Sequence, residues 1–159
     1  KRRSWNNIVI GGAAGAFPPL IGVAAVTGTV DALGVYMFAF VFFWTPPHFW
    51  TLSILLRDDY AAARVPMLPT LTSLRATAWQ VVLYIGLLIA LAWLPLVAGY
   101  GGITFAVVAT LLSLQWIRKS RPLFGAPTHQ EVLSAYKYSL LHLAGVFLVL
   151  AIEPVLPWY

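Results

Sequence analysis

Apolar residues run along the chain in long stretches separated by short polar or charged segments. A helix needs about 20 mostly apolar residues to cross a bilayer, so each long stretch is a candidate membrane span. The fourth stretch is the shortest. The pattern predicts an all-α, polytopic transmembrane helical bundle whose five spans cover residues 8–27, 33–55, 76–97, 103–117 and 138–156. The two longest polar loops are predicted at 56–75 and 118–137.

The composition excludes a water-soluble enzyme. Of the 159 residues, 60% are hydrophobic and 9% are charged, whereas a typical soluble domain is about 45–50% apolar and about 25% charged. The spans and their loops occupy the whole chain, so residues 1–159 are expected to form a single transmembrane domain. There is no cysteine, which rules out disulfides and thiolate metal sites. Because the chain opens with Lys1 rather than methionine, we expect its N-terminal part to be missing.

The net charge of +5 does not indicate nucleic-acid binding, because the bases are few and form no continuous stripe. With five spans, all ten lysines and arginines fall on one side of the membrane. The positive-inside rule makes that side cytoplasmic. We therefore expect a multi-pass protein of a bacterial plasma (inner) membrane, embedded in the lipid bilayer, with loops 56–75 and 118–137 in the cytoplasm.

The first long loop carries the most chemically informative residues. Asp58 and Asp59 are adjacent, Tyr60 follows them, and Arg57 and Arg64 flank the group. Carboxylate oxygens suit Mg²⁺, which commonly bridges to substrate phosphates, and arginine donates paired hydrogen bonds to phosphate oxygens. The alternative is a solvated loop in which the two carboxylates merely pair with the two arginines. The spacing alone leaves both interpretations open.

The second informative segment is Trp44–Trp50, inside the second span, where Pro46 and Pro47 precede His48. An ionisable group at membrane depth is a candidate functional residue. A neutral histidine bonded to a neighbouring helix is an equally open interpretation. In the first span, the G-x-x-x-G spacing from Gly11 to Gly15 is typical of close helix packing.

Three segments of this chain resemble one family of membrane enzymes. They are residues 7–22, 44–50 and 58–69, in the same order and at the expected separations. Together they resemble the protoheme IX farnesyltransferases, or heme O synthases, a branch of the UbiA superfamily of membrane prenyltransferases. The resemblance implies a nine-helix bundle around a central cavity, of which this chain would form the last five helices. It would contain only the second of two acidic motifs.

The resemblance also implies an activity. Members of this branch bind farnesyl diphosphate through Mg²⁺ and transfer the farnesyl group to a vinyl group of heme b, which gives heme o and releases diphosphate. Carried over by position, Asp58 and Asp59 are the catalytic and metal-binding residues. The substrate-binding residues would be Arg57, Arg64, His48 and Tyr60. A downstream heme-modifying enzyme is a candidate partner, and the fragment alone is expected to be inactive.

Two positions depart from the family pattern, which usually has glycine where Arg64 and Ser73 stand. We therefore expect the geometry of this loop, and with it the role of Arg64, to differ from the family pattern. Alternatives from other classes are a fragment of a transporter or channel, a purely structural membrane subunit, and another aromatic prenyltransferase. Mg²⁺-dependent binding of diphosphate would separate an enzyme of this type from the first two.

Overall fold

The computed structural model describes residues 6–99 and 101–155, and within these ranges the only regular elements are helices. The predicted all-α fold is confirmed. Lys1, Arg2 and Arg3, and the last residue of the predicted span 138–156, lie outside the described residues. The five long helices are α1 (Asn7–Thr27), α2 (Ala32–Leu55), α5 (Leu74–Val97), α6 (Ile103–Ser120) and α7 (His129–Ile152). The short elements are α3 (Arg57–Ala62), α4 (Leu68–Leu71) and the 3₁₀ turns η1 (Arg121–Phe124) and η2 (Glu153–Val155).

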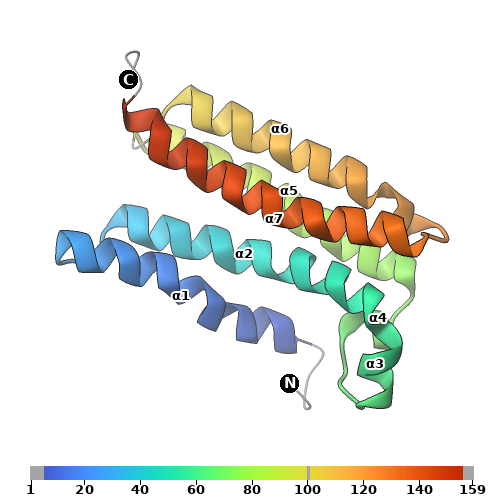
Figure 1. Ribbon diagram of the computed structural model, residues 1–159. Helices are drawn as coiled ribbons and strands as arrows, with labels where there is room; N and C mark the ends of the chain where they lie inside the picture. The colour runs from blue at the N-terminus through green and yellow to red at the C-terminus, as the bar shows by residue number, and fades with distance from the viewer. Residues whose placement is uncertain (1–5, 100, 156–159) are drawn as a thin grey trace.

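Four of the long helices, α1, α2, α5 and α7, are long and apolar enough to cross a membrane. The protein is therefore a multi-pass membrane protein. The fifth, α6, ends in Arg118 and Lys119 and is not among those four. Helix α6 lies alongside α5 and α7 in the same bundle (Figure 1). That α6 also crosses the membrane stays a prediction.

The helices pack in an order that leaves α1 at one edge (Figure 1). Helix α1 packs on α2, α2 packs on α5 and α7, and α6 contacts both α5 and α7. The core between them is rich in aromatic side chains, and Phe40, Trp50, Phe105 and Trp116 are almost completely buried. Many other large apolar side chains are exposed, as expected where lipid rather than water surrounds a helix.

Side-chain caps and a glycine set several helix ends. Asp31 accepts a hydrogen bond from the Gly34 N–H at 2.8 Å and so caps α2, while Gly28, at φ 75°, ends α1. Thr128 and Glu131 form a reciprocal capping box that starts α7. The last long helix therefore begins nine residues before the predicted span 138–156.

Both predicted loops contain more helix than the hydropathy pattern indicates. Residues 118–137 are helical except for the short connection at 125–128, because α6 continues to Ser120 and α7 starts early. Residues 56–75 contain α3, α4 and the first two residues of α5. The paired prolines inside α1 and α2 do not interrupt either helix.

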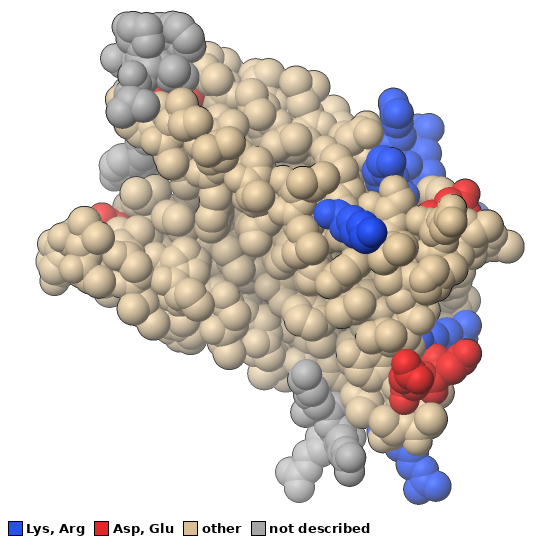
Figure 2. All heavy atoms as spheres, viewed as in Figure 1, with Lys and Arg blue, Asp and Glu red and all other residues tan. Residues whose placement is uncertain are grey.

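Charged side chains gather at one end of the bundle, where α3 and the α6–α7 connection lie (Figure 2). All seven described basic residues lie at or near this end. They are Arg57, Arg64, Arg75, Arg118, Lys119, Arg121 and Lys137. The helix order thus supports the one-sided distribution of bases that was predicted from the spans.

The opposite end of the bundle is held by a buried carboxylate. Glu153 is 3% exposed and accepts hydrogen bonds from the backbone N–H groups of Gly102, at 2.9 Å, and Phe105, at 2.7 Å. Those N–H groups lie at the start of α6, where no residue of the helix itself supplies a side-chain cap. The end of α7 is in this way bonded to the start of α6.

Replacing Glu153 with alanine is expected to destabilise the protein. The change leaves two N–H groups in a buried site without their acceptor, so the free energy of unfolding should fall by about 2–4 kcal/mol. Glu153→Gln keeps one acceptor oxygen, so its free energy of unfolding should lie between those of Glu153→Ala and the wild type. Unfolding of the intact natural protein in detergent measures the effect.

Glu131→Ala is the matched control, since it removes an exposed capping carboxylate and should lower the free energy of unfolding much less than Glu153→Ala. Equal stability of Glu153→Ala and the wild type would show that the Glu153 carboxylate does not stabilise the start of α6.

Candidate functional site

The two predicted metal-binding carboxylates lie at the charged end of the bundle. Asp58 and Asp59 occupy the first turn of α3, which follows α2 after a single residue. Both side chains are exposed, as is Arg57, while Tyr60 is half-buried. The Tyr60 N–H donates to the Leu56 carbonyl at 3.0 Å, so the backbone turns directly from α2 into α3. The carboxylates are thus presented at the mouth of the bundle.

Neither carboxylate is neutralised by a neighbouring arginine. Among the described residues, Asp58 and Asp59 form no ion pair and no side-chain hydrogen bond, and the same is true of Arg57 and Arg64. The pairing considered as an alternative is therefore not seen in this part of the chain. The carboxylate oxygens and the guanidinium groups all remain available to a ligand.

Arg64 occupies a backbone position that favours glycine. Its φ is 53°, and it is the only non-glycine residue with positive φ among residues 6–99 and 101–155. The Val65 N–H donates to the Tyr60 carbonyl at 2.9 Å and the Arg64 N–H to the Ala61 carbonyl at 3.0 Å. These two bonds form a Schellman motif, whose left-handed position is most often glycine. Arg64 therefore adopts a left-handed conformation, which costs a residue that has a Cβ about 1–2 kcal/mol.

Tyr60 and Arg64 line the same small hollow beside α3, with a volume of about 270 Å³. Pro66 and Thr70 complete part of its wall. The Asn7 side chain, at the start of α1, donates from Nδ2 to the Pro66 carbonyl at 3.1 Å. This bond ties the beginning of α1 to the loop that carries the acidic and basic residues.

His48 lies inside the bundle and is held on both faces by aromatic rings. Its ring stacks on Trp44, with centroids 4.3 Å apart, and on Tyr136 of α7, with centroids 4.9 Å apart. Its Nδ1 lies 2.7 Å from Ser139 Oγ, and Trp44 Nε1 donates to the Ser139 carbonyl at 3.0 Å. His48 is buried and seven residues before the end of α2, so it sits about 10 Å below α3 along the helix.

The hydrogen bonds of Ser139 determine which nitrogen of His48 carries the proton. The Ser139 hydroxyl donates its only hydrogen to the Tyr136 carbonyl at 2.5 Å. With that hydrogen on the Tyr136 carbonyl, the hydroxyl accepts from Nδ1 of His48, and Nε2 is then an acceptor with a free lone pair. Nε2 has no hydrogen-bond partner in the described chain and is not fully enclosed by protein. It remains available to a ligand.

A cleft of about 340 Å³ lies between α1, α2 and α7, next to this histidine. Trp44 and Phe49, which contact the His48 ring, form part of its wall. Gly11 and Gly15 also line it, and a Cβ at either position would meet nothing within 4 Å. The glycine pair that was predicted to pack helices therefore opens onto the cleft. Gly12 makes the close contact instead, 3.1 Å from Thr45 for an added Cβ.

The donor set at α3 fits a metal that is shared with a substrate. No group of three or more His, Asp or Glu side chains that could enclose a metal ion occurs among the described residues. Mg²⁺ is commonly held by one or two carboxylates together with substrate phosphates and water. Two adjacent, unpaired carboxylates beside free guanidinium groups meet that requirement, whereas they would not hold an ion tightly by themselves.

The sequence analysis did not single out three side chains that shape the site. Asn7 positions the loop through the Pro66 carbonyl, and Tyr136 and Ser139 of α7 position the histidine of α2. A polar or aromatic residue in an apolar run is the only local signal they give. Conversely, the six predicted site residues fall into two groups, with five on or just after α3 and His48 within the bundle.

This fold and site define a class: a helical membrane protein with an acidic and basic mouth above an aromatic-lined cleft. The chain belongs to the UbiA prenyltransferase family, which matches residues 1–152. Prenyltransferases of this family generally use a divalent metal with a diphosphate substrate. A transporter fragment is not favoured by this match.

Relatives with high identity carry one name. The chain is 47% identical over 153 residues to protoheme IX farnesyltransferase of Thermus thermophilus, which covers 96% of this chain and 25% of that protein. It is 43% identical over 147 residues to the protein of that name in Chloroflexus aurantiacus, covering 92% of this chain and 25% of the relative. It is 44% identical over 157 residues to the protein of that name in Brucella ovis, covering 96% of this chain and 50% of the relative. The chain thus spans half or less of these relatives. No solved structure matches it.

Proposed function

We propose that the natural protein containing this chain is a heme-modifying farnesyltransferase. The observation that carries the proposal is the pair of free carboxylates on α3, held above a cleft lined by aromatic rings and glycines. The shared name of relatives at 43–47% identity supports heme b and farnesyl diphosphate as the substrates. Heme o and diphosphate would be the products, and an enzyme that modifies heme o further is a proposed partner.

The diphosphate end of the substrate would be held at α3. Asp58 and Asp59 would hold Mg²⁺, which supplies positive charge to the diphosphate when it is bound. Arg64 and Arg57 would donate hydrogen bonds to the phosphate oxygens, since both guanidinium groups are free of carboxylate partners. Tyr60 shares the hollow with Arg64 and would position the same group.

The cleft beneath would take the apolar parts of both substrates. Breaking the bond between the farnesyl C1 and the diphosphate oxygen sends the electron pair to the diphosphate and leaves an allylic cation. The rings of Trp44 and Phe49 would stabilise that cation and exclude water from it. The porphyrin vinyl group then forms the new carbon–carbon bond, and addition of one water, with loss of a proton, gives the hydroxyl of the product.

The complete reaction belongs to the whole natural protein. This chain supplies two carboxylates and one side of the cleft, and it spans half or less of the relatives. We therefore propose that residues 1–159 alone do not catalyse the transfer.

The charged end is proposed to face the cytoplasm of a bacterial inner membrane, because it carries all of the described bases. In a cysteine-free version of the intact protein, Val30→Cys should react with a membrane-impermeant maleimide added to intact spheroplasts. Ala61→Cys should react only after lysis. The two exposed sites lie at opposite ends of α2, so the reverse labelling pattern would contradict the orientation.

Asp58→Asn and Asp59→Asn in the intact protein should each reduce the formation of heme o by about 100-fold or more. Asparagine keeps the size of the side chain but loses the negative charge that holds Mg²⁺. Conversion of heme b is measured with farnesyl diphosphate and Mg²⁺ in a membrane preparation. Glu131→Gln removes a carboxylate from the same end of the bundle and should retain activity. Wild-type turnover in both aspartate variants would refute the assignment.

His48 is proposed to position or coordinate heme through Nε2. His48→Phe keeps a ring between Trp44 and Tyr136 but removes both nitrogens, and should weaken binding of heme b by roughly tenfold. The affinity for farnesyl diphosphate should stay the same. Titration followed by the Soret absorbance of heme measures the change, and His48→Ala shows the added cost of losing the ring. Unchanged heme affinity and heme o yield in both variants would exclude this role.

A further inference from the structure

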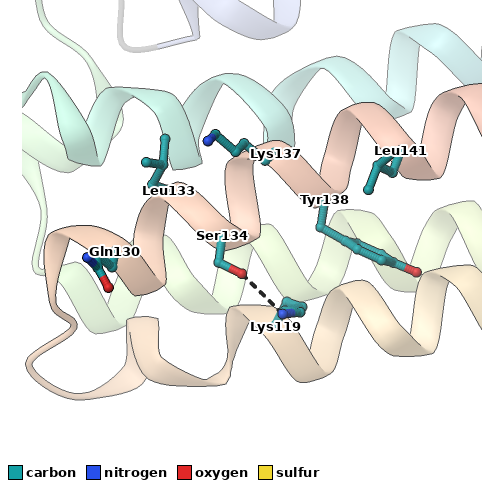
Figure 3. Close-up of a pocket in the computed structure, with 7 residues that line it drawn as sticks. All are labelled: Lys119, Gln130, Leu133, Ser134, Lys137, Tyr138 and Leu141. Atoms are coloured by element: carbon teal, nitrogen blue, oxygen red, sulfur yellow. Dashed lines mark hydrogen bonds between the residues drawn. The ribbon is translucent and has the colours of Figure 1, made fainter.

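A groove on α6 and α7 lies outside the site described above. Its volume is about 440 Å³, and Figure 3 shows the seven side chains that line it. Lys119 comes from the end of α6, and the other six come from residues 130–141 of α7. The lining residues are Lys119, Gln130, Leu133, Ser134, Lys137, Tyr138 and Leu141.

The groove and the candidate site use opposite sides of α7. Tyr136 and Ser139 contact His48 and Trp44 on α2. Ser134 and Tyr138 instead reach α6, through hydrogen bonds with Lys119 Nζ, at 3.1 Å, and with the Leu112 carbonyl, at 3.2 Å. Because successive residues of a helix are turned by about 100°, the groove faces away from the histidine. The groove is therefore separate from the farnesyl transfer site.

The polar part of the groove carries positive charge without a compensating carboxylate. Lys119 and Lys137 form no ion pair among the described residues. The nearby Glu131 carboxylate is bound to Thr128 in the capping box of α7. Gln130 and Ser134 lie among the lining residues and bring further polar groups to the same place. The groove thus attracts an anion and can donate hydrogen bonds to it.

The rest of the groove is apolar and continues along the membrane-spanning part of α7. Leu141 lines it one helical turn beyond Lys137 and is 66% exposed. An anion-binding end at the charged face of the bundle is followed by apolar surface toward the middle, which is the arrangement of a phospholipid.

We propose that this groove binds an anionic phospholipid of the leaflet at the charged end of the bundle. The phosphate lies between Lys119 and Lys137 and accepts hydrogen bonds from Ser134 or Gln130. The acyl chain lies along Tyr138 and Leu141, beyond Lys137. Basic pockets between helices at this depth favour anionic over zwitterionic headgroups because each lysine near the surface adds electrostatic attraction.

Binding is tested on the intact natural protein in detergent, by native mass spectrometry with phosphatidylglycerol and phosphatidylcholine of identical acyl chains. The wild type should retain phosphatidylglycerol preferentially. Lys119→Gln with Lys137→Gln should weaken that binding by roughly 10- to 30-fold and leave binding of phosphatidylcholine unchanged. Arg75→Gln with Arg121→Gln removes the same charge from the same end, outside the groove, and should stay within about twofold of wild type.

Three results would overturn the proposal. The first is equal retention of the two lipids by the wild type, as expected if another segment of the protein covers the groove. The second is an equal loss in the control double variant, which would indicate general attraction by the charged end. The third is displacement of the lipid by glycerol phosphate at the same concentration, which would indicate a site for a free phosphate without acyl-chain contact.

Discussion

The junction between α2 and α7 at Ser139 is the interaction on which the interior of this protein depends. One residue of α7 accepts two hydrogen bonds from α2, from Trp44 through its carbonyl and from His48 through its hydroxyl. In an apolar bundle these groups have no water as an alternative partner, so the pairing fixes the rotation of both helices. The same pairing orients His48 and stacks it between two rings. The two hydrogen bonds to Ser139 therefore determine both the packing of α2 on α7 and the orientation of His48.

A second pair repeats the arrangement between α6 and α7. The Ser113 hydroxyl donates to the Ala109 carbonyl at 2.8 Å and lies 2.9 Å from Nε2 of His142. By the same count of hydrogens, His142 must donate from Nε2. The two histidines differ in the surroundings of their second ring nitrogen. His142 Nδ1 is fully buried without a partner, whereas the free nitrogen of His48 is not fully enclosed. A serine that is already bonded to its own helix therefore acts as an acceptor that selects the histidine tautomer.

Hydropathy was sufficient to predict the helices but not the polar contacts between them. The runs at 8–27, 33–55 and 76–97 match α1, α2 and α5 closely, because apolar length alone decides a span. The start of α7 was missed because its first turns carry Gln130, Glu131 and Lys137, which lower the hydropathy while the Thr128 capping box still starts a helix. The partners of His48 could not be predicted either, since Ser139 is 91 residues away along the chain. The acidic loop was recognisable from adjacent residues, which carry their chemistry without tertiary contacts.

Arg64 shows how geometry and sequence can differ at a site. The resemblance to the family predicts glycine there, and the Schellman motif explains that preference because it requires a left-handed residue at this position, just after α3. With arginine at this position the turn still forms both backbone hydrogen bonds, which offset the strain of the left-handed residue. Its consequence is that an arginine lines the same hollow as Tyr60, just after the helix that carries Asp58 and Asp59, where glycine would leave the hollow without charge.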